Sequence, residues 1–284
     1  MIVSVSVDDH LVAGRYRLDE ADRGREIRRA WDTLLRRPVA LRFVDSSPGV
    51  ENGIRTLAAL QHPALPQVYD AGAGYVVTHY AGPRTLAGTP PLPLPEVRRI
   101  GVRLADALAH LHSYGLVHRD LQPATVRIDA SDEPCLADFS PWSGVQGVGY
   151  LSPEQVRGQR IGPASDVYAL GLVLLECLTG HQEYGTPEER LRRPPVVPRT
   201  LPPGVVRELS LMTALSPRRR PAAGECARRL REVDLTRVGG RVGRRLAAAS
   251  VTAVLGLGGA LWASHSASPT ISAPAPDSSV AHGY

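Results

Sequence analysis

Two short stretches near the middle of the chain carry carboxylates that could act together. Asp120 lies within residues 116–126, and Asp138 follows shortly afterwards within residues 137–140. Carboxylate oxygens are the ligands that magnesium prefers, and an aspartate can also accept the proton of a hydroxyl group. The pair could therefore hold one magnesium ion and a hydroxyl group. The alternative is structural, because such aspartates also bond to nearby backbone groups.

The composition limits the classes of protein that the chain could represent. Its 284 residues are 43% hydrophobic, which is enough to bury the core of one large domain or two small ones. All 33 basic residues are arginines, so no lysine is available to grip a phosphate group. The net charge of +5 forms no basic stripe interleaved with aromatic residues, and nucleic-acid binding is therefore not predicted. Three widely separated cysteines match no metal-ligand spacing, and no structural metal is predicted.

The elements that would position the two aspartates can be predicted from apolar patterns. In the first part of the chain, alternation predicts strands at residues 11–18, 26–32, 38–44, 68–71 and 75–80. A helix is predicted at residues 50–61. The turn between the first two strands carries three carboxylates and Gly24, and is expected to be an ordinary solvated turn.

The second part of the chain reads mainly as helix. Apolar residues at helical spacing predict an amphipathic helix at residues 95–114. A short hairpin, formed by residues 126–129 and 135–137, is predicted between the two aspartates. Residues 165–180 are apolar nearly all round, which predicts a buried central helix.

Several motifs occur along the chain in a characteristic order. They are Val39-Ala40-Leu41-Arg42, His118-Arg119-Asp120-Leu121-Gln122-Pro123-Ala124-Thr125, Ala137-Asp138-Phe139-Ser140, Tyr150-Leu151-Ser152-Pro153-Glu154 and Ser165-Asp166-Val167-Tyr168-Ala169-Leu170-Gly171. Together they resemble the motifs of the eukaryotic-type (Hanks-type) serine/threonine protein kinases of bacteria. The resemblance covers residues 14–233. It implies an α+β, bilobal protein-kinase-like domain at 11–233, with a small β-rich N-lobe at about 11–80 and a larger α-helical C-lobe at about 85–233.

The resemblance assigns roles to individual residues. It implies ATP and magnesium as cofactors, with Asp120 at the position of the catalytic base and Asp138 at that of the magnesium ligand. The positions that would face the nucleotide are Gly24, Ala40, Arg42, Thr78 and Arg127. The structural positions are His118, Phe139 and Asp166, with an expected ion pair between Glu154 and Arg220; Leu57 and Val68 would join His118 and Phe139 in a stacked apolar column.

Many ligand-facing positions depart from the family pattern. Arg42 and Gln122 each replace a lysine, Thr125 replaces an asparagine, Ser140 replaces a glycine, and only Gly24 remains of the phosphate loop's glycines. Gly53 stands where the family has a helix glutamate, and Glu51 lies about 200° around the helix from it. Arg127 replaces the leucine beneath the adenine ring; it could stack on a purine, fill the pocket or turn outward.

These departures favour a pseudokinase: a binding, scaffold or regulatory module of bacterial Ser/Thr phosphosignalling with little or no phosphoryl transfer. Removing one preorganised charge stabiliser already costs ~10²–10³ in rate. Its expected partners are proteins, either active Ser/Thr kinases or envelope-synthesis proteins. The alternative is a weak, atypical Ser/Thr kinase that uses Asp120 and Asp138, with Arg42 in place of the lysine. A third hypothesis is a nucleotide-binding switch without catalysis.

The C-terminal part of the sequence predicts a single membrane anchor. Residues 246–264 carry no charge, and about 19 helical residues span ~28 Å, close to the ~30 Å hydrocarbon core. An arginine-rich juxtamembrane segment at 234–245 precedes them, which places the kinase-like domain in the cytoplasm at the cell membrane. Residues 265–284 would form a short disordered tail outside. The alternative is a buried Ala/Gly-rich helix.

Overall fold

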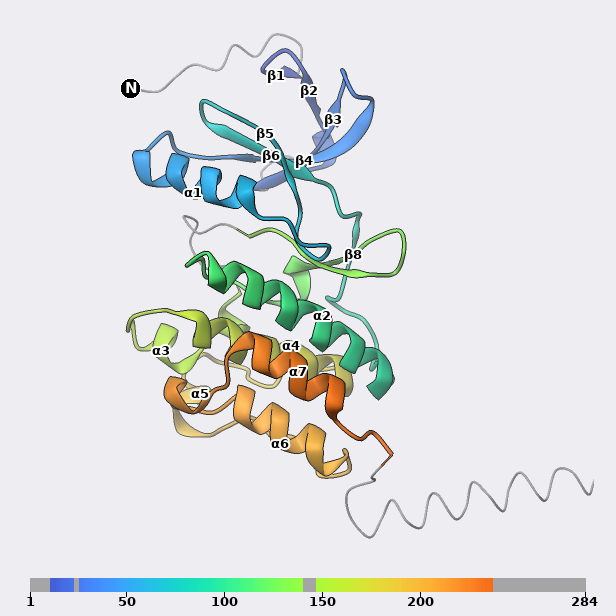
Figure 1. Cartoon of the computed structure of the whole chain (residues 1–284), viewed down its shortest axis with the longest axis vertical. Coiled ribbons are helices and arrows are strands. Elements are labelled where there is room, and N and C mark those ends of the chain that lie inside the picture. Colours follow the sequence, from blue (N-terminus) through green and yellow to red (C-terminus); the bar gives the residue numbers. More distant parts are fainter. Residues whose placement is uncertain (1–10, 23–25, 140–146, 237–284) are drawn as a thin grey trace, which may run out of the picture. The chain divides into compact units, whose positions relative to one another are not determined.

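The computed structural model describes residues 11–22, 26–139 and 147–236. The chain divides into two compact units, Met1–Arg237 and Val238–Tyr284, and all the described residues belong to the first. Within that unit a strand-rich N-lobe is followed by a helical C-lobe (Figure 1). This is the bilobal α+β arrangement that the resemblance implies.

The N-lobe is built on one antiparallel sheet with the strand order β1-β2-β3-β4-β6-β5. Its strands are β1 (Leu11–Val12), β2 (Tyr16–Leu18), β3 (Ile27–Asp32), β4 (Arg37–Phe43), β5 (Val68–Gly72) and β6 (Tyr75–His79). Alternate side chains along neighbouring strands point to the same face of the sheet, and on one face they are apolar and buried. The buried residues on that face include Tyr16, Ala30, Val39, Leu41 and Val77.

The predicted single strand at residues 11–18 is wrong, because the chain turns back within it. Ala13 and Gly14 have φ angles of 52° and 64°, and β1 pairs with β2 as a tight hairpin. A positive φ costs glycine little, so Gly14 permits the turn. Alternating polarity alone does not distinguish one long strand from two short ones on either side of such a turn.

One long helix and a short 3-10 turn complete the N-lobe. The helix α1 (Pro48–Ala59) begins slightly before the predicted residues 50–61, because Ser47 caps it by accepting a hydrogen bond from the Val50 N–H and Pro48 occupies its first turn. The 3-10 turn η1 (Glu20–Asp22) follows β2, where the sequence predicted a solvated turn.

The C-lobe is a stack of helices beneath a small sheet. Its main helices are α2 (Leu94–Ser113), α4 (Pro163–Thr179), α6 (Pro203–Met212) and α7 (Ala223–Glu232). Its short elements are η2 (Pro123–Thr125), η3 (Val148–Tyr150), α3 (Pro153–Val156), α5 (Glu189–Arg192) and η4 (Pro217–Arg219). A three-stranded sheet contains β7 (Arg84–Thr85), β8 (Val126–Ile128) and β9 (Pro134–Leu136) in that order.

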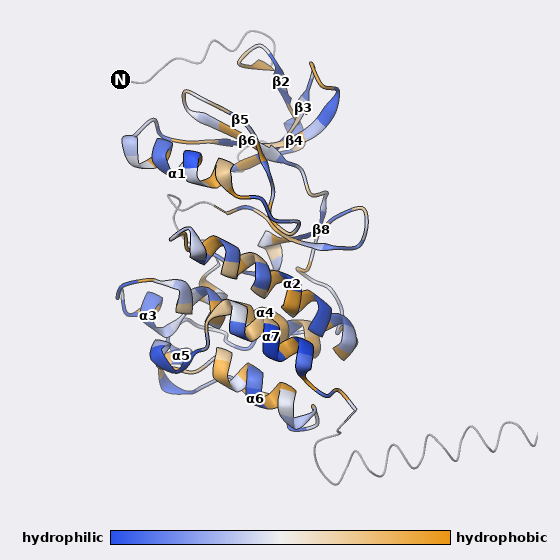
Figure 2. Cartoon of the chain, viewed as in Figure 1, coloured by the Kyte–Doolittle hydropathy of each residue, from blue (hydrophilic) through white to orange (hydrophobic). Residues whose placement is uncertain are grey.

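The C-lobe core forms where α2, α4 and α7 meet. As the sequence predicted, α4 is buried along most of its length. Gly101 of α2 allows the close approach, since a Cβ there would lie only 2.9 Å from Leu174 of α4 and 3.0 Å from Leu230 of α7. Figure 2 shows hydrophobic colouring on these helices where they face one another.

All three cysteines are buried and have free thiols, and each lies on a different secondary-structure element. Cys135 lies on β9, Cys177 on α4 and Cys226 on α7. Burial raises the pKa of each thiol to about 12. At neutral pH these residues therefore behave as small apolar side chains.

Within the described part of the chain, no helix combines the length and apolar character that crossing a membrane requires. The predicted spanning segment at 246–264 and the tail at 265–284 lie outside the described residues, as does most of the juxtamembrane segment.

Candidate functional site

The site is a cavity of about 320 Å³ that opens between the N-lobe sheet and the start of the C-lobe. Ala40 of β4 and Thr78 of β6 lie side by side in its lining, because these two residues are register partners. Leu57 and Leu60 add apolar surface from the end of α1. The volume falls at the lower end of the range for small-molecule pockets.

Arg42 of β4 is a buried cation that ties the two lobes together. Its Nη1 lies 3.1 Å from a Glu26 carboxylate oxygen, and its Nη2 donates to the Asp138 carbonyl at 2.9 Å. Burial lowers the pKa of Arg42 and the charge of Glu26 opposes that shift, but an arginine remains protonated at neutral pH. Glu51 is exposed and pairs instead with Arg55 on α1. The carboxylate beside the strand cation therefore comes from the residue just before the neighbouring strand β3.

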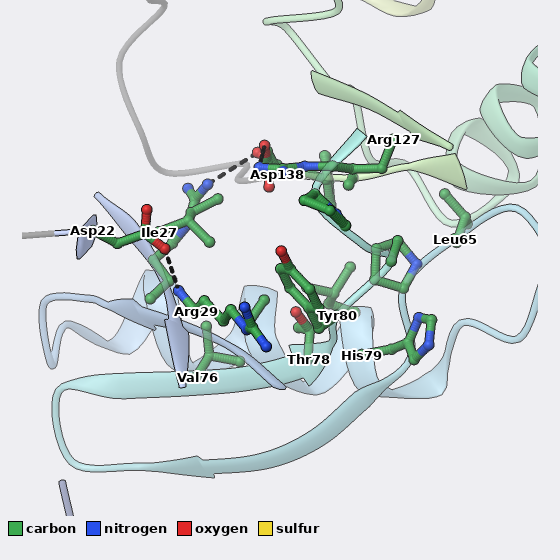
Figure 3. Close-up of a pocket in the computed structure, with 18 of the residues that line it drawn as sticks. Asp22, Ile27, Arg29, Leu65, Val76, Thr78, His79, Tyr80, Arg127 and Asp138 are labelled. Atoms are coloured by element: carbon green, nitrogen blue, oxygen red, sulfur yellow. Dashed lines mark hydrogen bonds and ion pairs between the residues drawn. The ribbon is translucent and has the colours of Figure 1, made fainter. Parts of the chain in front are cut away.

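Arg127 lies along the cavity and holds the carboxylate of Asp138. Its Nη2 is 3.3 Å from Asp138 Oδ2, and its Nη1 donates to the Gly82 carbonyl at 3.3 Å. In Figure 3 the Arg127 side chain reaches across to Asp138 above the ring of Tyr80. Of the three orientations that the sequence left open, the outward one is excluded, and Arg127 fills part of the cavity.

A third arginine, Arg29, borders the cavity, and the sequence did not single it out. The guanidinium of Arg29 on β3 lies over the Tyr80 ring, 5.5 Å from its centroid. Glu26 was missed as well. The register of the β3–β4 hairpin would have identified Arg29, because it pairs with Ala40, whereas Glu26 only precedes Ile27, the register partner of Arg42.

Side chains of the loop around Asp120 form hydrogen bonds within the loop and to Gly147. Asp120 Oδ1 accepts the Gly147 N–H at 2.8 Å, and Oδ2 accepts the Gln122 side-chain amide at 3.3 Å. The Thr125 hydroxyl accepts the Gln122 N–H at 3.1 Å and lies 3.0 Å from the Gln122 carbonyl, to which it donates. Gln122 and Thr125 thus cap the short turn η2, and both take part in its local structure.

These residues do not fit a magnesium ion. The Asp138 carboxylate is paired with a guanidinium, the Thr125 hydroxyl is buried in its own turn, and Asp120 is held by an amide and a backbone N–H. Among residues 11–22, 26–139 and 147–236, no cluster of three or more His, Cys, Asp or Glu side chains could ligate a metal. Gly24 and Ser140 lie outside the described residues.

Asp166 organises the backbone that carries Asp120. This buried carboxylate accepts the N–H groups of His118 and Arg119 at 2.8 and 2.9 Å, and His112 Nε2 lies 2.8 Å from it. Arg119 has a φ angle of 71°, which is unfavourable for a residue with a side chain. The two backbone hydrogen bonds that Asp166 accepts offset that strain and fix the direction of the chain from Arg119 onwards.

His118 and Phe139 pack together beneath the cavity, with ring centroids 5.5 Å apart. Leu57 and Val68 belong to the same apolar cluster. His118 Nε2 lies 3.3 Å from the Ala137 carbonyl, and burial lowers the pKa of this histidine. The four residues of the predicted apolar column thus share one core.

Glu154 and Arg220 form a buried, two-pronged ion pair with contacts of 2.6 and 2.9 Å. Ser165 also donates to Glu154, at 2.7 Å. Burial alone would raise the pKa of Glu154, but the hydrogen bonds from Arg220 and Ser165 lower it. The Arg220 guanidinium lies over the Tyr168 ring of α4, so the pair fastens α3 to the central helix.

Comparison with known proteins identifies relatives of one kind. The chain is 36% identical to the serine/threonine-protein kinase PknB of Mycobacterium leprae over 45% of this chain and 24% of that protein. It is 30% identical to the serine/threonine-protein kinase PrkC of Bacillus subtilis, over 60% of this chain and 31% of that protein. It is 33% identical to the DNA damage-responsive serine/threonine-protein kinase RqkA of Deinococcus radiodurans, over 75% of this chain and 38% of that protein.

The chain thus spans less than two fifths of the length of each of these relatives. The model of the protein kinase domain family matches residues 51–194, which are 144 of the 284 residues. The match includes most of α1, the loop around Asp120, Asp138 and all of α4. The chain therefore belongs to the protein kinase domain family, among the Hanks-type serine/threonine kinases of bacteria.

Proposed function

We propose that this chain is a membrane-anchored pseudokinase, a binding or scaffold module in bacterial Ser/Thr phosphosignalling that transfers little or no phosphate. The observation that carries the proposal is the ion pair between Arg127 and Asp138. It places a fixed positive charge on the carboxylate that an active kinase would offer to magnesium. A magnesium ion would have to displace that guanidinium and then bind beside it.

The rest of the site supports the same proposal. Asp120 keeps its position, but its two oxygens accept hydrogen bonds from Gly147 and Gln122. Asp166 accepts its two backbone hydrogen bonds, and Glu154 is paired with Arg220. A domain that keeps its fold while its magnesium ligands are occupied by protein groups is suited to binding other proteins.

The anchor and the partners are part of the proposal. The uncharged segment at 246–264, preceded by arginines, would hold the domain at the cytoplasmic face of the cell membrane with a short tail outside. There the domain would meet active Ser/Thr kinases or envelope-synthesis proteins.

A phosphotransfer assay on the full chain tests the proposal. With radiolabelled ATP, magnesium and a general protein substrate, the expected incorporation equals that of the Asp120→Ala variant. Transfer that is clearly above background and is abolished by Asp120→Ala would overturn the proposal. It would instead favour the weak kinase, which further requires that Arg42→Ala abolishes both ATP binding and turnover.

The cavity supports a second candidate, the nucleotide-binding switch. Apolar lining from Ala40 and Leu57 lies close to the guanidinium groups of Arg42 and Arg127, which match phosphate oxygens well. Arginines would then supply the positive charge that a metal ion usually brings. ATP with a chelator should stabilise the chain, by ~2.7 kcal/mol at 100 times its dissociation constant.

Partner pull-downs separate this candidate from the scaffold. Under the switch, the amount of captured partner changes when ATP is added. Equal amounts of captured partner with and without ATP would exclude the switch hypothesis and favour a scaffold that is insensitive to nucleotide.

A further inference from the structure

A second hollow lies in the C-lobe, which we call the C-lobe groove. It has a volume of about 790 Å³ and shares no lining residue with the cavity described above. Part of its lining comes from Gly115, Val117 and Arg119, just before Asp120 in the chain. The largest part comes from residues 159–165, which lead from the end of α3 into the start of α4 (Figure 1). The groove is therefore a separate candidate site.

The groove carries positive charge that no acid neutralises. Arg119 and Arg160 line it and are exposed, and neither pairs with a carboxylate among the described residues. Glu154 is the one acid in the described lining, but it is 4% exposed and already bound by Arg220. The groove is thus an electropositive hollow, which favours an anionic occupant.

The arginines of α7 differ from those of the groove. Arg228, Arg229 and Arg231 each pair with a glutamate or an aspartate. Beside the groove, Arg218 follows the lining residue Pro217 and is exposed, and it too has no acidic partner in the part of the chain that the structure describes. The chain thus neutralises the arginines of a surface helix but supplies no acids to those of the groove.

The rest of the lining suits an extended peptide. Val117 and Ile161 provide apolar surface. A Cβ built at Gly115 or Gly162 would meet no atom within 4 Å, so another chain could approach the backbone closely at both positions. The described lining includes no aromatic side chain on which nucleic-acid bases could stack. Because the groove's arginines come from separate segments, they suit several carboxylates along a peptide better than one compact anion.

We propose that the C-lobe groove binds an acidic segment of a partner protein, whose Asp or Glu side chains pair with Arg119 and Arg160. A guanidinium group can bind a carboxylate through two parallel hydrogen bonds. The inference rests on the proposed binding function and names the chemistry of the partner. Binding of this kind requires neither ATP nor magnesium, so its test is independent of the phosphotransfer assay.

Fluorescence anisotropy of the full chain in detergent micelles tests the proposal. The probe is a short fluorescein-labelled peptide that alternates glutamate with alanine, measured without ATP or metal. We expect it to bind, and the same peptide with glutamine in place of glutamate to bind roughly tenfold more weakly or worse. Arg160→Gln should weaken binding of the glutamate peptide by roughly tenfold, because it removes a charge-assisted hydrogen-bonded pair. Raising the salt concentration should weaken binding as well.

Arg207→Gln is the matched control. Arg207 is also exposed and without an acidic partner among the described residues, but it lies on α6, outside the groove lining. This variant should keep the affinity of the parent chain. Equal losses in Arg160→Gln and Arg207→Gln would overturn the proposal, because the overall charge would then attract the peptide.

Three further outcomes would also overturn the proposal. The first is that the glutamate peptide fails to bind, or binds no better than the glutamine peptide. The second is tighter binding of a single-stranded oligonucleotide of equal charge. The third is tighter binding of a peptide in which one phosphoserine replaces all the glutamates, because the groove would then recognise a single phosphate. Absent phosphotransfer together with any of these outcomes would leave the pseudokinase proposal standing with a different binding surface.

Discussion

At the scale of single residues, the orientation of Arg127 decides what the cavity can accept. We predict that Arg127→Leu allows magnesium-bound ATP to bind, because Asp138 loses its guanidinium partner and the floor of the cavity becomes apolar. Thermal unfolding should show this as a Tm increase of roughly 5–10 °C at ligand concentrations near 100 times the dissociation constant. The parent chain should show a smaller increase under the same conditions.

Arg84→Leu provides the matched control, since Arg84 also pairs with an aspartate, Asp132, but lies outside the cavity lining. Equal responses of the two variants to magnesium-bound ATP would mean that Arg127 does not control access.

The positions of the candidate site could be predicted from the sequence, but not the directions of its side chains. Motif spacing singled out Asp120, Arg127 and Asp138, and the structure places Arg127 beside Asp138. The direction of Arg127 depends on the Gly82 carbonyl, which is far away in the sequence and becomes an acceptor only in the folded chain. Glu26 was missed for the same reason, since its role depends on the pairing of two strands.

At the scale of elements, the loop that carries Asp120 depends on one helix terminus. Asp166 lies in the first turn of α4 and accepts two backbone N–H groups of that loop. We predict that Asp166→Ala lowers the free energy of unfolding by about 2–4 kcal/mol, because it leaves two backbone donors without an acceptor. Urea unfolding of the two proteins would measure the difference.

Asp106→Ala is the control for this prediction. Asp106 pairs with Arg231 nearer the surface, where an ion pair contributes less than about 1 kcal/mol. A loss for Asp166→Ala that is no larger than the loss for Asp106→Ala would contradict the anchoring role.

Elements with a strong repeating pattern were predicted well, and those set by a single turn were not. The helix α2 and the strands β3 and β4 lie within a few residues of their predicted bounds, because many side chains contribute to each pattern. The strand predicted at 11–18 failed because one left-handed turn at Ala13 and Gly14 outweighs the alternation around it. The 3-10 turns are too short to leave a periodic signal.

At the scale of the whole molecule, histidines that lose solvent on folding make the stability depend on pH. Burial lowers the pKa of His118 below the ordinary value of 6.5, and partial desolvation also lowers the pKa values of His62 and His79. The unfolded chain therefore binds more protons than the folded chain as pH falls below about 6.5. We predict that the free energy of unfolding is highest above that pH and decreases towards pH 5, by at most about 1.4 kcal/mol per pH unit for each histidine.

Denaturant unfolding between pH 5 and pH 8 would measure the slope, and His118→Gln should make it shallower. His181→Gln is the control, because this histidine is exposed. An unchanged slope in His118→Gln would show that His118 makes no contribution to the acid sensitivity.

The three buried thiols make the chain a natural reporter of its own opening. A cysteine-modifying reagent can reach Cys135, Cys177 or Cys226 only after β9, α4 or α7 exposes its thiol to solvent. Because the three positions sample the small C-lobe sheet and two core helices, their separate modification rates distinguish local fraying from global unfolding. No engineered label is needed, and mass spectrometry of the modified peptides would give an opening rate for each element.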